Sequence, residues 1–141
     1  FNPIEITNML NILKQNNSDL VFASRYEKNC SSEDDTFITL IGNFFFTTLG
    51  KIFFKLNITD ILYTYVIGKT EKVKKLNLQS KDFVFCVELP IKAKQNKFIL
   101  NTSKSNERAR IGGKKKVNAF KDGILILFKM IKLFFSKWKK K

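Results

Sequence analysis

The spacing of apolar and polar positions predicts a helix and then a strand at the start of the chain. Asn2-Pro3-Ile4-Glu5 has a capping residue, a proline at the first helical position and an acid that closes a capping box. Apolar residues at helical spacing follow, so we expect a helix to about residue 15. The apolar run LVFAS, residues 20–24, is typical of a buried parallel strand. Arg25 follows this strand directly. Ligands of open α/β sheets bind at the carboxyl ends of strands, so Arg25 is a candidate ligand-binding residue.

A polar stretch and a long apolar stretch come next. Residues 26–35 lack apolar periodicity and predict a loop, whereas residues 36–56 are strongly apolar and long enough for a helix. A membrane span is the alternative for this helix. Lys51 and Lys55 shorten the apolar run below the roughly 20 residues that a span needs. We therefore expect a helix that lies against the sheet or on the surface of a bilayer.

The following pattern again alternates strand and helix. Residues 63–68 are rich in β-forming side chains, and a short helix is expected over 71–76. A longer helix is expected over 82–95, with Pro90 interrupting it or starting its final turn. Residues 97–103 predict a further strand. The alternation of strands and helices indicates an α/β fold.

The C-terminal region consists of a basic linker and an apolar helix. Residues 104–116 contain Gly112 and Gly113 among basic side chains, and residues 117–141 predict a helix whose apolar part is too short to span a bilayer. Trp138 and the lysines around it fit an amphipathic helix in the membrane interface. A core helix with a solvated basic tail and the start of a membrane anchor are the alternatives. The expected domains are therefore 1–103, the linker 104–116 and the helix 117–141.

Composition limits the classes of protein that fit. The chain has 141 residues, 44% of them hydrophobic and 15 of them Phe, which is enough for one packed domain. The net charge is +14 and is concentrated after residue 103. Such a field attracts phosphates of any kind, so it supports nucleic acid and an anionic membrane about equally.

Cysteine and histidine usage excludes several kinds of site. The chain has no His, and Cys30 and Cys86 lie far apart, which argues against a zinc site, a Cys-His nucleophile and a disulfide framework. Both cysteines are expected to be free thiols in a reducing compartment. Any general base must be a carboxylate or a lysine. The chain starts with Phe1 and has no signal peptide, so we expect a fragment of a longer protein.

The order of four segments resembles a known family. LVFASRY, ITLIGNFFFTTLGKIFFKLNITD, DFVFCVELPIKA and ERARIGGKKKVNAFKDG together resemble the second half of a family 2 glycosyltransferase, in the group of dolichyl-phosphate mannosyltransferase and bacterial polyprenyl-phosphate sugar transferases. The resemblance implies the C-terminal part of a GT-A fold. It also implies a nucleotide-sugar donor, a polyprenyl-phosphate or related membrane acceptor, and a position at the cytoplasmic face of the membrane.

The resemblance further implies that the nucleotide-binding half lies upstream. That half would supply the ligands of a divalent metal, Mg or Mn, so no metal ligand is expected in these 141 residues. The isolated residues are accordingly expected to have no transferase activity.

Individual residues match the motifs of the family. Arg25 matches the Arg of a Gly-Ser-Arg segment near the phosphates, and Thr39 and Asn43 match a Ser-x-x-Gly-Asn motif on the helix after the acceptor loop. Asp60 matches the Asp of Thr-Asp-x-x-x-Gly-Phe, the candidate for organising or deprotonating the acceptor. The family's Arg before the Ser is replaced by Asp35, and its Gly-Phe is replaced by residues 64–65.

The second group of matches lies nearer the C-terminus. Glu88 matches a helix acid near the active site. Arg110, Gly112, Gly113 and Lys116 match Arg-x-Gly-Gly-x-Ser-Lys, in which a lysine has replaced the Ser. Arg108 belongs to the same basic stretch. These basic residues are expected to bind phosphate, with the two glycines letting backbone N–H groups approach the anion.

Each candidate also has a structural alternative. Asp60 could cap a helix, Arg25 could end a strand at the surface, and Glu88 could pair with Lys92 on a solvated face. The basic linker could be a solvated charge run. The alternative function is a basic nucleic-acid-binding protein, or a membrane-surface protein without catalysis. Nucleic acid is the weaker of these because the basic residues adjoin an apolar helix, and no aromatic platform or binding motif accompanies them.

Overall fold

The computed structural model describes residues 1–109, 111–113 and 118–138 as a mixed α/β structure with a small sheet. Its elements are, in chain order, α1 (Glu5–Gln15), β1 (Leu20–Ser24), α2 (Phe37–Phe54), β2 (Val66–Gly68), α3 (Thr70–Lys75), α4 (Phe85–Gln95), β3 (Leu100–Lys104) and α5 (Ala119–Trp138). Every helix and strand expected from the sequence is present within a few residues of its expected bounds.

The three strands form a mixed sheet with β1 in the centre. The strand order is β2-β1-β3, with β1 antiparallel to β2 and parallel to β3. The parallel register pairs Leu20 with Leu100 and Ser24 with Lys104, so the carboxyl ends of β1 and β3 lie side by side. All five residues of β1 are buried. The prediction of a buried parallel strand over residues 20–24 is therefore confirmed.

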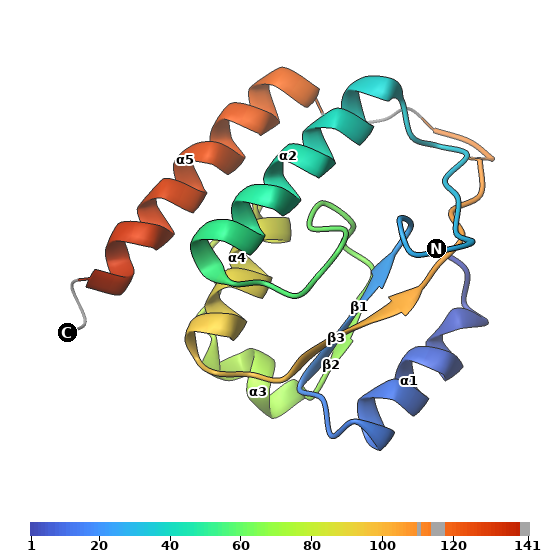
Figure 1. Cartoon of the computed structure of the whole chain (residues 1–141), viewed down its shortest axis with the longest axis horizontal. Helices are drawn as coiled ribbons and strands as arrows, with labels where there is room; N and C mark the ends of the chain where they lie inside the picture. The colour runs from blue at the N-terminus through green and yellow to red at the C-terminus, as the bar shows by residue number, and fades with distance from the viewer. Residues whose placement is uncertain (110, 114–117, 139–141) are drawn as a thin grey trace.

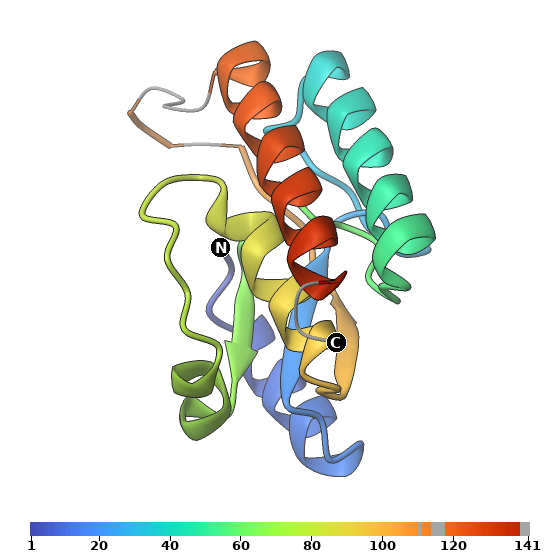
Figure 2. The ribbon, with the colours of Figure 1, turned by 90° about the vertical axis from the view of Figure 1, so that its left-hand side faces the viewer.

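The two faces of the sheet are covered by different helices (Figures 1 and 2). Alternate side chains of a strand point to opposite faces. Accordingly Val21 and Ala23 pack with Met9 of α1, whereas Leu20 and Phe22 belong to the larger core beneath α4. Helices α2 and α5 lie side by side on the far side of that core and run in the same direction.

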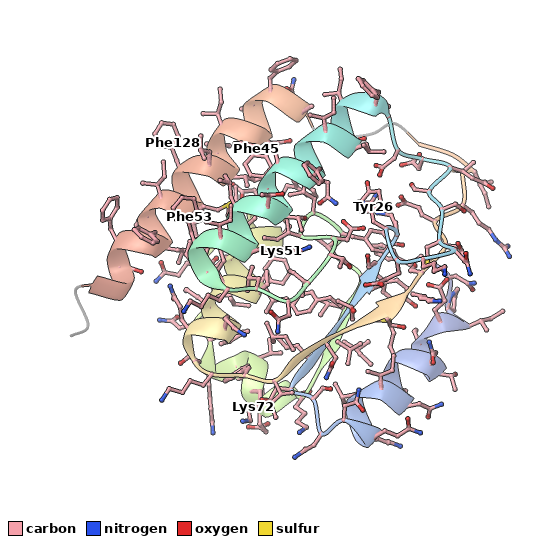
Figure 3. All side chains as sticks on the ribbon, in the orientation of Figure 1. Tyr26, Phe45, Lys51, Phe53, Lys72 and Phe128 are labelled. Carbon is pink, nitrogen blue, oxygen red and sulfur yellow. The ribbon has the colours of Figure 1, made fainter. Side chains whose placement is uncertain are left out.

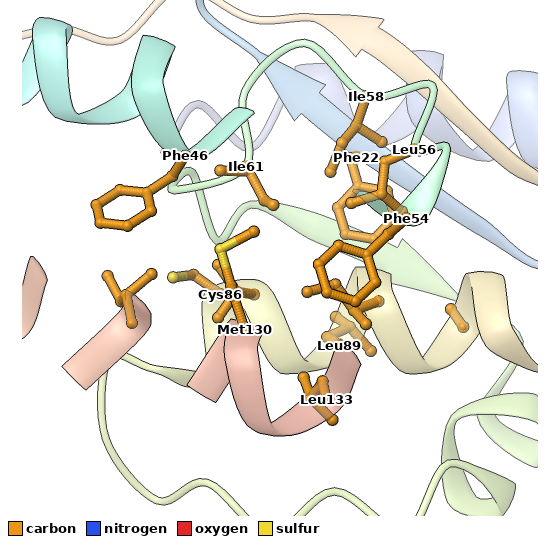
Figure 4. Packing of buried hydrophobic residues seen from close by; sticks show 14 of the residues in the cluster. Phe22, Phe46, Phe54, Leu56, Ile58, Ile61, Cys86, Leu89, Met130 and Leu133 are labelled. Atoms are coloured by element: carbon orange, nitrogen blue, oxygen red, sulfur yellow. The ribbon is translucent and has the colours of Figure 1, made fainter. Parts of the chain in front are cut away.

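The larger core joins α2, α4, α5 and the sheet (Figure 4). Phe46 of α2, Leu89 of α4, and Met130 and Leu133 of α5 are among its buried members. Thus α5 buries one face in the same core as residues from the expected domain 1–103. One face of α5 is therefore part of the core, and residues 139–141 of the basic tail lie outside the described residues.

Three predicted details of the helices are wrong. Asn2 does not cap α1, which begins at Glu5 after Ile4, and the Asn2 side chain accepts a hydrogen bond from the Ile4 N–H instead. Glu5 closes no capping box because its carboxylate accepts hydrogen bonds from Ser105 Oγ and Asn106 N. Pro90 neither interrupts α4 nor starts its final turn, since it lies in the middle of the helix, which runs from Phe85 to Gln95.

Candidate functional site

Arg25 is the centre of a buried ionic cluster at the carboxyl end of β1. Its Nε donates to Asp60 Oδ2 at 2.7 Å and its Nη2 donates to Asp60 Oδ1 at 3.0 Å, which is a two-point contact. The Arg25 main-chain N–H also donates to Asp60 Oδ2, at 3.1 Å. Arg25 is 8% exposed and Asp60 is 1% exposed. The alternatives of a surface Arg25 and a helix-capping Asp60 are therefore both wrong.

Two further carboxylates share the Nη1 atom of Arg25. Asp35 Oδ1 accepts from Nη1 at 3.1 Å, and Glu107 Oε2 accepts from it at 2.9 Å. Tyr63 and Tyr26 place their rings 4.5 and 5.3 Å from the guanidinium carbon, an arrangement that favours a cation. One guanidinium is thus surrounded by three carboxylates, which leaves the cluster with a formal charge of −2.

Burial and charge act in opposite directions on the groups of the cluster. Burial raises the pKa of Asp60, and the hydrogen bonds and charge of Arg25 partly offset this rise. For Arg25, burial disfavours the charged form, but the hydrogen bonds to Asp60 and Glu107 outweigh it and raise the pKa. Burial also raises the pKa of Tyr63 to about 12. Arg25 is therefore a permanent cation at this site.

A cavity of about 560 Å³ opens beside this cluster. One end is polar and is formed by Arg25, Asp34, Asp35, Thr39 and Glu107. The remainder lies between the first halves of α2 and α5 and is mostly apolar; it is lined by Ile38, Ile41, Gly42, Phe46, Ala119, Phe120, Gly123 and Ile126 among others. A cavity of this form suits a ligand with one polar end and one apolar end.

The structure brings some of the predicted residues to this cavity. Arg25 and Thr39 line it, but Thr39 also closes the capping box of α2 with Thr36 and donates to Asp35 Oδ1 at 3.1 Å. Asp60 does not line it. Asn43 is 1% exposed, and its side chain accepts from the Leu62 N–H at 2.9 Å, so it holds the loop after Asp60 against α2.

Glu88 lies apart from the Arg25 cluster. Its carboxylate accepts from Lys92 Nζ at 2.8 Å, from Lys129 Nζ at 3.0 Å and from the backbone N–H groups of Gln79 and Ser80. The expected pair with Lys92 exists, but Glu88 is fully buried, so the alternative of a solvated face is wrong. The carboxylate joins α4 to α5. A place for Glu88 near an active site stays a prediction.

The basic stretch is described only in part. Arg108 is exposed and, with Gly112, lines a second hollow of about 580 Å³ beside Phe1 and Pro3. Gly113 has a φ of 81°, in the left-handed region that favours glycine. Arg110 and Lys116 lie outside the described residues.

Sequence reasoning missed four residues around Arg25. Asp35, Tyr26 and Tyr63 were named only as parts or neighbours of expected segments, and Glu107 was not a candidate. Glu107 comes three residues after β3 ends, and Arg25 comes directly after β1. A parallel pairing of these two strands would therefore have placed both residues at the same edge of the sheet.

The carboxylates of the cluster do not fit a metal site. Asp35, Asp60 and Glu107 converge on a guanidinium, and a bound cation would have to replace that charge. Within the part of the chain that the structure describes, no group of three or more His, Cys, Asp or Glu side chains is arranged to hold a metal ion. No chemistry of a metal is therefore assigned to these residues.

The outer faces of α2 and α5 form an exposed apolar surface, which we call the α2–α5 face. Figure 3 shows Phe45 and Phe53 on α2 and Phe128 on α5. The large exposed apolar side chains of the two helices are Phe37, Ile38, Leu40, Ile41, Phe44, Phe45, Ile52 and Phe53 on α2, and Phe120, Ile124, Leu125, Leu127, Phe128, Ile131 and Phe135 on α5. Of these, Ile38, Ile41 and Phe120 also line the cavity. Exposed apolar surfaces are typical of sites that bind a protein partner or a membrane.

Among the described helices, α2 also has the length and apolar composition of a possible membrane span, although 28% of it is buried inside the protein. Its inner face is bound to the protein by polar contacts, because Thr47 Oγ1 accepts from the Ile61 N–H at 3.2 Å and Asn43 binds Leu62. One face of α2 therefore belongs to the folded core and the opposite face to the exposed surface.

Comparison with protein-family models, curated proteins and solved structures finds no match for this chain.

Proposed function

We propose that these residues form the acceptor-binding part of a GT-A glycosyltransferase, which transfers a sugar from a nucleotide-sugar donor to polyprenyl phosphate or a related membrane amphiphile. The observation that carries the proposal is the cavity between α2 and α5, whose apolar walls lead to the polar groups around Arg25. An isoprenoid tail fits the apolar part, and the reacting head group fits the polar end.

The position of the cavity supports a membrane acceptor. The helices that line it also present the α2–α5 face to the outside, so a lipid could enter the cavity without leaving an apolar environment. Lysines on both helices, among them Lys51 and Lys132, provide attraction to anionic head groups. Under this proposal both helices lie in the cytoplasmic interface of the membrane.

The residues of the cluster have distinct roles in the proposal. Arg25 orients the head group, and Asp60 positions Arg25 because it occupies the Nε and Nη2 donors. A hydroxyl acceptor also needs a base. Asp35 is better placed for this than Asp60, since Asp35 lines the cavity. A phosphate acceptor is already ionised and needs only positioning.

The donor nucleotide and its divalent metal belong, in this proposal, to a segment outside these 141 residues. The chain by itself should therefore bind an acceptor without transferring a sugar to it. Turnover of a nucleotide sugar by the isolated chain would contradict the assignment of the donor and metal sites to another segment.

Binding of farnesyl phosphate tests the proposal directly. Gly42 lines the cavity, and a Cβ at this position meets no atom within 4 Å, so Gly42→Leu fills open cavity space. We expect the native chain to bind farnesyl phosphate in detergent and Gly42→Leu to bind it at least about tenfold more weakly. Asn11→Leu, on the exposed surface of α1, is the matched control and should bind normally. Equal binding of farnesyl phosphate by the native chain and both variants would show that the cavity is not the acceptor site.

A membrane-surface protein without catalysis is the second candidate, and the α2–α5 face is the observation that favours it. It predicts flotation with anionic vesicles without farnesyl phosphate binding in the cavity. Retention of single-stranded oligonucleotides at physiological salt, without flotation, would favour nucleic acid instead.

A further inference from the structure

The number of donors on Arg25 limits how an anionic ligand can reach it. Nε and one hydrogen of Nη2 are used by Asp60, and both hydrogens of Nη1 are used by Asp35 and Glu107. A phosphate that enters the polar end of the cavity must therefore displace a carboxylate to gain a donor of Nη1. We propose that, without a ligand, the Glu107 carboxylate occupies an anion-binding position beside Arg25 Nη1. An incoming phosphate would take its place. This inference rests on the proposed function for the identity of the ligand.

Glu107 is the carboxylate that can leave most easily. The side chain of Asp60 is inaccessible to solvent and does not line the cavity. Asp35 is 10% exposed and is held by Tyr26 and Thr39 as well as by Arg25. Glu107 lines the cavity and its side chain is 19% exposed. Among the described residues, Ser32 is the other side chain that donates to its carboxylate.

The Glu107 oxygen stands where a phosphate oxygen would bind. Glu107 Oε2 accepts from Arg25 Nη1 at 2.9 Å and from Ser32 Oγ at 2.6 Å. Two donors therefore converge on one anionic oxygen at the polar end of the cavity. A phosphate oxygen in that position would receive the same two charge-assisted hydrogen bonds.

The backbone lets the side chain move without local unfolding. The main chain of Glu107 is paired with residues 31–33: its N–H donates to Ser31 O at 3.0 Å, and its carbonyl accepts from Glu33 N at 3.0 Å. These bonds form the isolated bridge between Ser32 and Glu107. A change of Glu107 rotamer releases the carboxylate while the bridge stays intact.

Charge makes the exchange necessary. With Asp35, Asp60 and Glu107 in place, the cluster carries −2, and a phosphate would add further negative charge in a partly buried site. The departure of Glu107 removes one of these charges. Glu107 therefore raises the ligand concentration needed to occupy Arg25.

Glu107→Gln tests the exchange, with Glu33→Gln as the matched control. Both variants remove one negative charge from the same pair of segments, but the Glu33 carboxylate accepts from the Ala109 N–H and makes no contact with Arg25. We expect Glu107→Gln to bind farnesyl phosphate about tenfold more tightly than the native chain, and Glu33→Gln to bind it like the native chain. Farnesol should bind all three equally. An equal gain in both variants, or no gain in Glu107→Gln, overturns the proposal.

A second measurement separates this inference from the proposed function. The Nε–H resonance of Arg25 in nitrogen-15 labelled protein can be followed while inorganic phosphate is added, which needs no occupant in the apolar part of the cavity. We expect a response in Glu107→Gln at about a tenth of the phosphate concentration that the native chain requires. If farnesyl phosphate does not bind but this response is present, the proposed polyprenyl-phosphate acceptor is wrong. The exchange of Glu107 for phosphate is then still supported. If Arg25 does not respond in Glu107→Gln, the exchange is excluded.

Discussion

Glu88 of α4 and Lys129 of α5 form an ion pair in which Oε1 and Nζ are 3.0 Å apart, although the Glu88 side chain is inaccessible to solvent. The same carboxylate accepts from Lys92 and from the backbone of residues 79–80. Because α5 forms one wall of the cavity, this buried carboxylate helps to fix the width of the candidate acceptor site.

The stability of the protein should depend on Glu88 in a pH-dependent way. Burial alone would raise the pKa of Glu88, but hydrogen bonds from Lys92, Ser80 and Lys129 outweigh it and hold the pKa well below the ordinary value of 4.5. The folded state thus binds this proton more weakly than the unfolded chain. The stabilisation is fully present above the ordinary pKa and is lost as the pH falls through the folded value.

We expect Glu88→Gln to lower the free energy of unfolding by about 3 kcal/mol at pH 7, because it leaves two lysines and two N–H groups without their anion. Urea denaturation at pH 7 and at pH 3 measures this, and the difference from the native chain should shrink at the lower pH. The control is Glu71→Gln, which breaks an exposed pair with Lys74 and should change stability little. A loss that is the same at both pH values would contradict the role given to the Glu88 charge.

Asp60→Asn should weaken the position of Arg25. The substitution leaves a buried guanidinium without its two-point partner, so we expect a loss of about 3 kcal/mol in unfolding free energy and a shifted Nε–H resonance of Arg25. In a complete transferase, turnover should fall by orders of magnitude because the head group is no longer oriented. Asp82→Asn, at an exposed turn before α4, is the control. An unchanged Arg25 resonance would show that Asp60 does not position this side chain.

The α2–α5 face should determine binding to vesicles. Phe44 is 74% exposed and Phe128 is 66% exposed, and burial of a Phe side chain contributes about 1.5 to 3 kcal/mol. Phe44→Glu or Phe128→Glu should therefore weaken flotation with anionic vesicles by about tenfold or more. Ile99→Glu is the matched control because Ile99 is also exposed, at 48%, but precedes β3 outside this face. Comparable losses of vesicle binding in all three variants would show that the net charge of the protein, and not the apolar surface, determines binding.

Gly68 and Gly42 should respond in opposite ways to alanine. A Cβ at Gly68 would come within 2.2 Å of Leu20 Cδ2 in the core and 3.1 Å of Asp19 O, whereas a Cβ at Gly42 meets nothing within 4 Å. We expect Gly68→Ala to destabilise the fold by about 1 to 3 kcal/mol, and Gly42→Ala to stabilise it slightly through its better helix propensity. Thermal unfolding of the two variants provides the comparison. A neutral Gly68→Ala would mean that Leu20 can repack at little cost.

The local pattern of the sequence determined where the elements lie and that Arg25 follows a strand. Apolar runs and helical spacing depend on which face of each element is buried, and this information is present within a few neighbouring residues. For that reason LVFAS indicated a buried strand and residues 36–56 a long apolar helix. The charge of +14 and the absence of histidine also limit the chemistry that the chain can perform, whatever its fold.

The tertiary structure decided which side chains meet. Glu107 contacts Arg25 across 82 positions of the chain, and Lys129 reaches Glu88 only because α5 packs on α4. These pairings depend on strand order and helix packing, which no local pattern specifies. They changed the interpretation of Arg25 from an open phosphate contact to a cation already surrounded by carboxylates. The sequence by itself thus determined the helices and strands and the position of Arg25 at the end of a strand. Long-range packing alone decided which carboxylates surround Arg25 and therefore the net charge of the cluster.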